Sequence, residues 1–145
     1  MTEQPTHPPH QKSRQHLKIR QQNLNKSLTA QSKILQQLAP HNYNIAAIQE
    51  PYLDFNHNSR ASHNWYTLYP KEHYAMPNKT RSLLLINKIM LTNKWSQIDF
   101  ASSDVMAAQI QTPIGLLLLI NMYNNLGTSK GLRKVIQYMR NKAHD

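Results

Sequence analysis

The chain has 145 residues, of which 39% are apolar, which leaves room for one domain with a single core. Lys and Arg number 17 against 7 Asp and Glu, and the resulting net charge of +10 predicts attraction to polyanions such as nucleic acid or an acidic membrane face. The absence of cysteine excludes disulfide-linked partners, thiol catalysis and Cys-containing zinc sites, and no segment approaches the roughly 18 apolar residues of a membrane span.

Residues 1–16 contain three prolines and three histidines but no apolar periodicity, which predicts a disordered basic leader. His7 and His10 make a poor metal site, because a flexible proline-rich tail fixes no ligand geometry. The N-terminus also lacks an apolar signal region, so we expect no secretion and an intracellular location, with the nucleus included.

A β-α-β unit follows the leader. Residues 17–23 alternate and then end in polar residues, which predicts a strand, and residues 45–49 predict a short strand buried on both faces. Between them, Ser27 or Thr29 can cap a helix that ends before Pro40. We expect the two strands to be adjacent and parallel, with a right-handed crossover.

Residues 54–63 form a polar loop, and the stretch after it is rich in strands. Strands are predicted at residues 65–69, 82–87, 95–100, 105–111 and 116–123. The turn at residues 112–115 has Pro and Gly where a type I turn favours them, so the last two strands form a hairpin.

A final amphipathic helix is predicted at residues 129–143, capped by Thr128 or Ser129. Its apolar positions recur at i, i+3, i+4 and i+7, namely Leu132, Val135, Ile136 and Met139. Its other face is basic, which agrees with a surface that attracts polyanions.

Acidic residues are scarce, and Glu50 is the best placed of them. Between Gln4 and His144 the acids are Glu50, Asp54, Glu72, Asp99 and Asp104. Glu50 follows a buried strand, where the carboxyl ends of strands open onto a ligand crevice. A hard cation such as magnesium takes one or two carboxylates together with substrate phosphate and water. Glu50 is therefore a candidate metal ligand, and a solvent-exposed glutamate at a strand end is the alternative.

Two other strand ends carry candidate site residues. Asn23 ends the first strand, where its amide could orient a carboxylate or donate to a phosphate oxygen, although asparagine is also common in turns. Tyr123 ends the last strand, where tyrosine is more often a half-buried packing residue. Each signal is weak when taken alone.

Taken in order, these positions resemble a known family. Residues 17–27, 45–52, 81–86 and 120–124 are similar to the N-terminal half of the endonuclease/exonuclease/phosphatase family, and most similar to the endonuclease domain of non-LTR retrotransposons. The resemblance covers residues 17–145, which we take as the domain. It implies an α/β fold, a four-layer sandwich of the DNase-like type in which two mixed sheets pack face to face with helices outside.

The resemblance also implies a chemistry. Family members cleave phosphodiesters with magnesium or manganese, and the metal stabilises charge on the phosphate and the departing oxygen. Glu50 matches the metal ligand, Asn23 the asparagine that helps to hold the phosphate and metal, and Tyr123 the aromatic hydroxyl near that phosphate. DNA is then the expected partner.

The chain departs from the family pattern beyond its final helix. Family members continue into Gly-Asp-Phe-Asn and Ser-Asp-His type motifs, which orient the water, stabilise the transition state and act as base. Nothing in this sequence corresponds to them, and His144-Asp145 is not such a motif. We therefore expect a truncated domain that is inactive alone, with an open sheet edge and exposed apolar faces.

Two other hypotheses stay open. The chain could be a non-catalytic, basic nucleic-acid-binding protein, whose binding would depend strongly on salt but not on Glu50. It could also be a phosphoesterase of the same family that acts on small phosphoesters. The charge of +10 favours DNA over the second of these.

Overall fold

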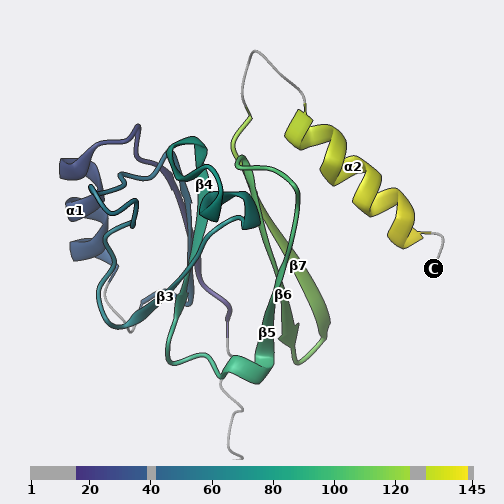
Figure 1. Cartoon of the computed structure of the whole chain (residues 1–145). Coiled ribbons are helices and arrows are strands. Elements are labelled where there is room, and N and C mark those ends of the chain that lie inside the picture. Colours follow the sequence, from purple (N-terminus) through teal and green to yellow (C-terminus); the bar gives the residue numbers. More distant parts are fainter. Residues whose placement is uncertain (1–15, 39–41, 125–129, 144–145) are drawn as a thin grey trace, which may run out of the picture.

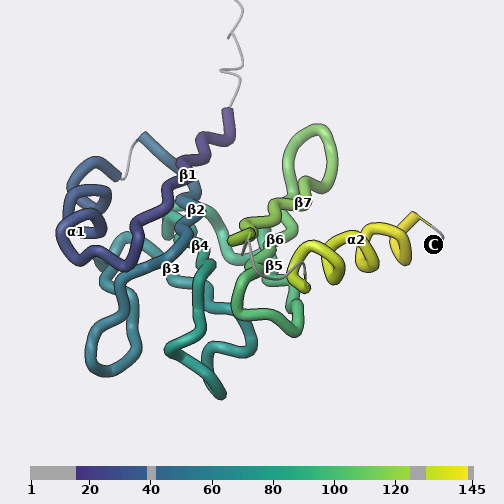
Figure 2. The backbone as a smooth tube through the Cα atoms, turned by 90° about the horizontal axis from the view of Figure 1, so that it is seen from above, coloured from purple at the N-terminus to yellow at the C-terminus, as the bar shows by residue number. Residues whose placement is uncertain are grey.

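In the computed structural model, which describes residues 16–38, 42–124 and 130–143, two sheets pack face to face with one helix outside each (Figure 1). Seen along the strands in Figure 2, the order is α1, first sheet, second sheet, α2. The predicted four-layer α/β sandwich is confirmed. The predicted leader and the predicted caps Thr128 and Ser129 lie outside the described residues, apart from His16.

The first sheet has the strand order β1-β2-β4-β3, formed by Ile19–Asn23, Ile45–Gln49, Ser82–Asn87 and Trp65–Leu68 respectively. β1 and β2 are parallel, as predicted, and are connected through α1 (Leu28–Gln37). The side chain of Ser27 caps α1 by accepting a hydrogen bond from the Ala30 amide at 3.2 Å. Between β3 and β4 lie two short 3-10 helices, η1 (Lys71–Tyr74) and η2 (Pro77–Lys79).

The second sheet has the order β5-β6-β7, formed by Trp95–Ile98, Val105–Thr112 and Gly115–Met122 respectively. The short helix η3 (Thr92–Lys94) leads into β5, and α2 (Lys130–Ala143) covers part of the outer face. We expected both sheets to be mixed, but in the described residues every pair in the second sheet is antiparallel. The reason is local, because these strands follow one another in sequence through short connections.

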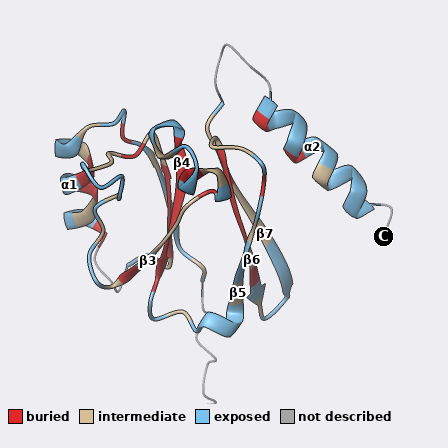
Figure 3. Cartoon of the chain, in the orientation of Figure 1, coloured by how far each residue is buried: buried red, intermediate tan, exposed pale blue. Residues whose placement is uncertain are grey.

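The core has three layers, set by the alternation of side chains along the strands. Ala46 and Ile48 of β2 face α1, whereas Ile45 and Ala47 face the second sheet and pack with residues such as Met106. The third layer, which includes Val105 and Val135, lies between β6 and α2. Figure 3 shows buried residues concentrated in the strands of both sheets and few along α2.

The apolar face predicted for the last helix is only partly buried. Val135 is buried, but Leu132, Ile136 and Met139 are 38%, 41% and 56% exposed. The sequence period identified the helix correctly, but a period gives no information about whether a partner covers the apolar face.

Candidate active site

Four strand ends meet at one end of the sandwich, at the top of Figure 1. In the first sheet, Asn23 is paired with Gln49, and Gln49 is paired with Ser82 on the antiparallel strand β4. The residues beyond those pairs, Glu50 and Arg81, therefore leave the sheet side by side. Tyr123 follows β7 in the second sheet at the same end.

The backbone around Glu50 is held tightly. Its amide donates to the Arg81 carbonyl at 2.8 Å, and its carbonyl accepts from the Lys26 amide at 2.8 Å. Glu50, Lys26 and Asn25 all have positive φ, of 48°, 56° and 49°. Left-handed backbone at non-glycine residues is strained and often occurs at functional sites. Here it is concentrated on the two turns that flank the carboxylate.

Glu50 and Tyr123 lie close together at this end of the sandwich. The pKa of Tyr123 is raised, first because its hydroxyl hydrogen-bonds to the Glu50 carboxylate, and further by desolvation and by the negative charge of Glu50. The Arg81 guanidinium lies 5.2 Å from the centre of the Tyr123 ring, and its charge opposes that shift. Two of the three predicted site residues are therefore adjacent.

Asn23 lies at the neighbouring strand end but is used differently. Its side chain is exposed, and its Oδ1 atom accepts a hydrogen bond from the Asn25 amide at 2.8 Å. This is an Asx turn, the structural alternative considered for this residue. The turn places the Lys26 amide against the Glu50 carbonyl, so Asn23 shapes the site through its side chain.

Asp104 and Arg81 belong to this site, and we assigned neither of them a role from the sequence. The Asp104 carbonyl accepts the Tyr123 amide at 2.8 Å. Burial raises the pKa of the Asp104 carboxyl, and the positive charge of Arg81 partly offsets the increase. A signal for Asp104 was present in the sequence, because the hairpin turn at residues 112–115 fixes the register that brings the start of β6 next to the end of β7.

A buried asparagine ties the strand ends together. Asn121 is 2% exposed, and its amide group donates to the carbonyls of Ile48 and Leu83 at 2.9 and 2.8 Å. Its backbone carbonyl accepts the Ser82 hydroxyl at 2.7 Å. Gln49 adds a bond from its Nε2 atom to the Met122 carbonyl at 2.9 Å. These bonds run between the sheets, so they hold the Glu50 and Tyr123 ends in register.

The site offers only a few protein ligands to a metal ion. Among the described residues, no group of three or more His, Cys, Asp or Glu is placed to hold an ion. Magnesium is often bound by one or two carboxylates plus phosphate and water, so a site centred on Glu50 with Asp104 nearby is compatible with that ion. The arrangement combines a carboxylate, a guanidinium and a hydroxyl, which suits a phosphate ester bound through a cation.

These elements form part of a DNase-like endonuclease fold. No family model matches the sequence, and no curated protein matches it. Among solved structures, the endonuclease domain of TRAS1, a telomere-specific non-LTR retrotransposon, is similar with a TM-score of 0.64 and 14% sequence identity. The match covers 88% of this chain and 54% of that domain, so the chain spans about half the length of the structure it matches. At this identity the likeness establishes the fold alone.

Proposed function

We propose that the chain is the metal- and phosphate-binding part of a magnesium-dependent DNA endonuclease of the non-LTR retrotransposon type. The observation that carries the proposal is the contact of Glu50 with Tyr123, beside Arg81 and Asp104, at the open end of this fold. Magnesium or manganese bound there would supply Lewis-acid stabilisation of the phosphate and the departing oxygen.

Each residue then has a defined part. Glu50 would hold the metal, and Asn23 would orient that carboxylate or donate to a phosphate oxygen. The Tyr123 hydroxyl, whose pKa is raised, could donate a hydrogen bond to a phosphate oxygen if a metal engaged Glu50. Arg81 would neutralise charge on the same group.

DNA is the proposed partner. The net charge is +10, and α2 contributes five Lys or Arg with no Asp or Glu, namely Lys130, Arg133, Lys134, Arg140 and Lys142. Such a helix favours contact with a phosphate backbone. No helix in the described part of the chain is long and apolar enough to cross a membrane.

The chain covers only part of the fold it matches, so we propose that it binds DNA and does not cleave it efficiently alone. A supercoiled plasmid incubated with the protein and magnesium should stay unnicked, while a labelled duplex should bind. Glu50→Gln should remove the magnesium-dependent part of binding, and Glu72→Gln, on η1, is the matched control. Robust nicking that Glu50→Ala abolishes would show that the chain is a complete nuclease.

The basic surface also supports a second candidate, a non-catalytic nucleic-acid-binding protein. In that case binding should fall by about 0.9 log units per log unit of salt for each duplex phosphate contact, with no dependence on Glu50 or magnesium. A phosphoesterase of the same family would instead release phosphate from small phosphoesters with magnesium and leave DNA intact.

A further inference from the structure

A hollow in the surface lies directly beside the candidate active site. It has a volume of about 280 Å³ and is lined by Lys26, Pro51, Tyr52, Leu53, Asn78 and Thr80. Its three walls are the chain segments that continue from the site. Lys26 follows Asn23 in the β1–α1 turn, Pro51 to Leu53 follow Glu50, and Asn78 and Thr80 precede Arg81. A ligand held at Glu50 and Arg81 therefore has this hollow next to it.

A buried glutamine in α1 holds the wall that follows Glu50. Gln31 is 3% exposed, and its Oε1 atom accepts the Tyr52 amide at 2.9 Å. Its Nε2 atom donates to the Ser59 hydroxyl and the Arg60 carbonyl, both at 2.6 Å. Leu53 also forms a β-bridge with Ser59. The wall is thus fixed from behind by helix α1.

A buried histidine holds the opposite wall. His73 is 5% exposed, its Nδ1 atom hydrogen-bonds to the Thr80 hydroxyl at 2.7 Å, and its ring stacks on Tyr69 with the ring centres 4.1 Å apart. Burial lowers the pKa of His73, which favours the neutral form of the ring over the charged one. The catalytic proposal uses neither Gln31 nor His73, yet both side chains hold the walls of the hollow in place before any ligand binds.

The residues that line the hollow are few, and they differ in chemistry. Lys26 provides a cation, Tyr52 an aromatic ring, Asn78 an amide that both donates and accepts, and Pro51 and Leu53 apolar surface. Pockets for drug-sized ligands start at about 300 Å³, so this one suits a single nucleoside rather than a longer segment. Aromatic rings that stack on a base are a common element of nucleic-acid sites.

We propose that this hollow, which we call the Tyr52 pocket, binds the sugar and base of one nucleoside attached to the phosphate held at Glu50 and Arg81. This inference rests on the proposed function, since it needs a phosphate at Glu50. The nucleoside phosphate could belong to a DNA strand or to a free nucleotide, and the test distinguishes the two.

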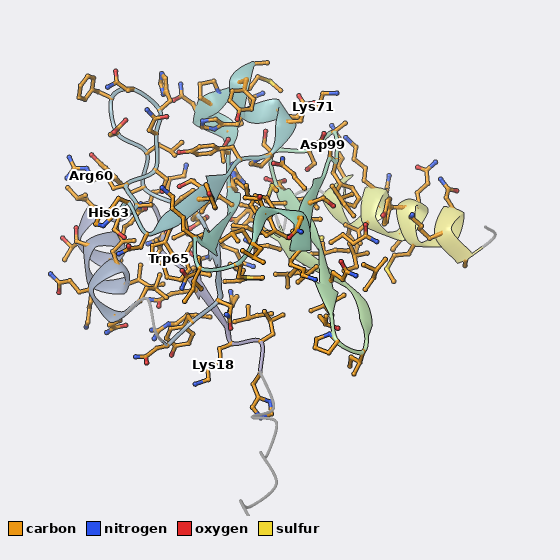
Figure 4. The ribbon with its side chains drawn as sticks, turned by 90° about the horizontal axis from the view of Figure 1, so that it is seen from below. Lys18, Arg60, His63, Trp65, Lys71 and Asp99 are labelled. Atoms are coloured by element: carbon orange, nitrogen blue, oxygen red, sulfur yellow. The ribbon has the colours of Figure 1, made fainter. Side chains whose placement is uncertain are left out.

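A larger hollow of about 890 Å³ lies at the other end of the sandwich and does not compete for this role. Lys18, which precedes β1, is part of its wall and lies at the edge of the described molecule in Figure 4. Among the described residues, its lining includes no Asp or Glu and no residue of the candidate active site.

Amide chemical shifts of the ¹⁵N-labelled chain, titrated with magnesium present, test the pocket. The probes are dimethyl phosphate, dTMP, the dinucleotide dTpdA and a short DNA duplex. Dimethyl phosphate should shift the amides of Glu50, Arg81 and Tyr123 alone. dTMP or dTpdA should shift these and also Lys26, Tyr52 and Asn78. If the pocket takes a nucleoside of a DNA strand, the duplex shifts both groups of amides; if it takes free nucleotides, dTMP does so and the duplex does not.

The outcomes separate this inference from the proposed function. If nucleotides and dimethyl phosphate shift the same amides around Glu50 and none at the Tyr52 pocket, the pocket is refuted while the phosphate site stands. If no probe shifts Glu50, Arg81 or Tyr123, the proposed function fails, and the inference fails with it.

Variants sharpen the result. Tyr52→Leu keeps apolar bulk but removes the aromatic ring, and should raise the dissociation constant for dTpdA roughly fivefold or more while leaving that for dimethyl phosphate unchanged. Tyr66→Leu, on β3, is the control and should change neither. Asn78→Ala, at an exposed position, gives a second variant should Tyr52→Leu disturb the fold. Nucleotide affinities equal to that of the parent chain in both Tyr52→Leu and Asn78→Ala would overturn the pocket.

Discussion

The two outer helices of this sandwich differ in how well they are packed. Ile34 of α1 and Leu38 at its end are 1% and 2% exposed, and Ser27 caps the helix. In α2 the exposed apolar residues outnumber the buried ones, and β7 adds Leu116 at 68% exposed. The first half of the fold is therefore a complete layer pair, whereas the second presents apolar surface to solvent. The candidate site draws residues from both halves.

The largest expected effect concerns the buried side of α1. Ile34→Ala should destabilise the protein by about 2–5 kcal/mol, because a fully buried side chain leaves a cavity. Ile136→Ala, on the exposed face of α2, should cost far less, within about 0.5 kcal/mol. Urea unfolding of both variants checks the difference. Equal losses would mean that α2 is as well packed as α1.

The Asn121 bridge between the sheets should come next. Asn121→Ala removes the two hydrogen bonds that the Ile48 and Leu83 carbonyls accept from its amide group, and each such bond contributes about 0.5–1.5 kcal/mol. The exposed Asn93→Ala, on η3, is the control. Urea unfolding measures this loss, and NMR spectra of the native variant should show shifted Glu50 and Tyr123 amide signals. Unchanged stability would mean that other contacts join the sheets at this end.

The α1 cap should give a smaller loss. Ser27→Ala removes the acceptor for the Ala30 amide and should cost about 1 kcal/mol. Ser27→Asp restores an acceptor and should recover most of the loss. Thermal unfolding followed by circular dichroism measures both, and a Ser27→Ala protein as stable as the parent would assign the cap to another group.

The smallest effect is the titration of Tyr123. Its pKa is raised in the folded protein, so its contribution to stability is fully present below the ordinary tyrosine pKa and is lost as pH rises through the folded value. Glu50→Gln removes the charged partner and should lower that pKa toward the ordinary range. Ultraviolet titration of tyrosinate, compared with Tyr123→Phe, checks this. An identical Tyr123 titration in Glu50→Gln would contradict the contact.

Much of the fold could be predicted from the sequence because local patterns determine it. The period of residues 17–49 gave the parallel pair and α1, and the turn at residues 112–115 gave the β6–β7 hairpin. The sequence could not show that α2 leaves Ile136 and Met139 exposed, because burial depends on what other segments cover a face.

The site was predicted only in outline. Glu50 and Tyr123 were singled out, but their contact arises from two sheets that no local pattern aligns. Asn121 looked like an ordinary strand residue, and only its burial between Ile48 and Leu83 reveals the bridge. Arg81 became a site residue only through its contact with the ring of Tyr123. The two residues are 42 positions apart in the sequence, so only the three-dimensional structure brings them together.

The central claim is that a divalent metal binds at Glu50, and manganese-induced broadening of amide NMR signals tests it most directly. Manganese should broaden the signals of Glu50, Arg81 and Tyr123 first, and the broadening should vanish in Glu50→Gln but persist in Asp99→Asn. Broadening that centres on Asp99 or Glu72, or that survives unchanged in Glu50→Gln, would contradict a metal site at the end of this sandwich.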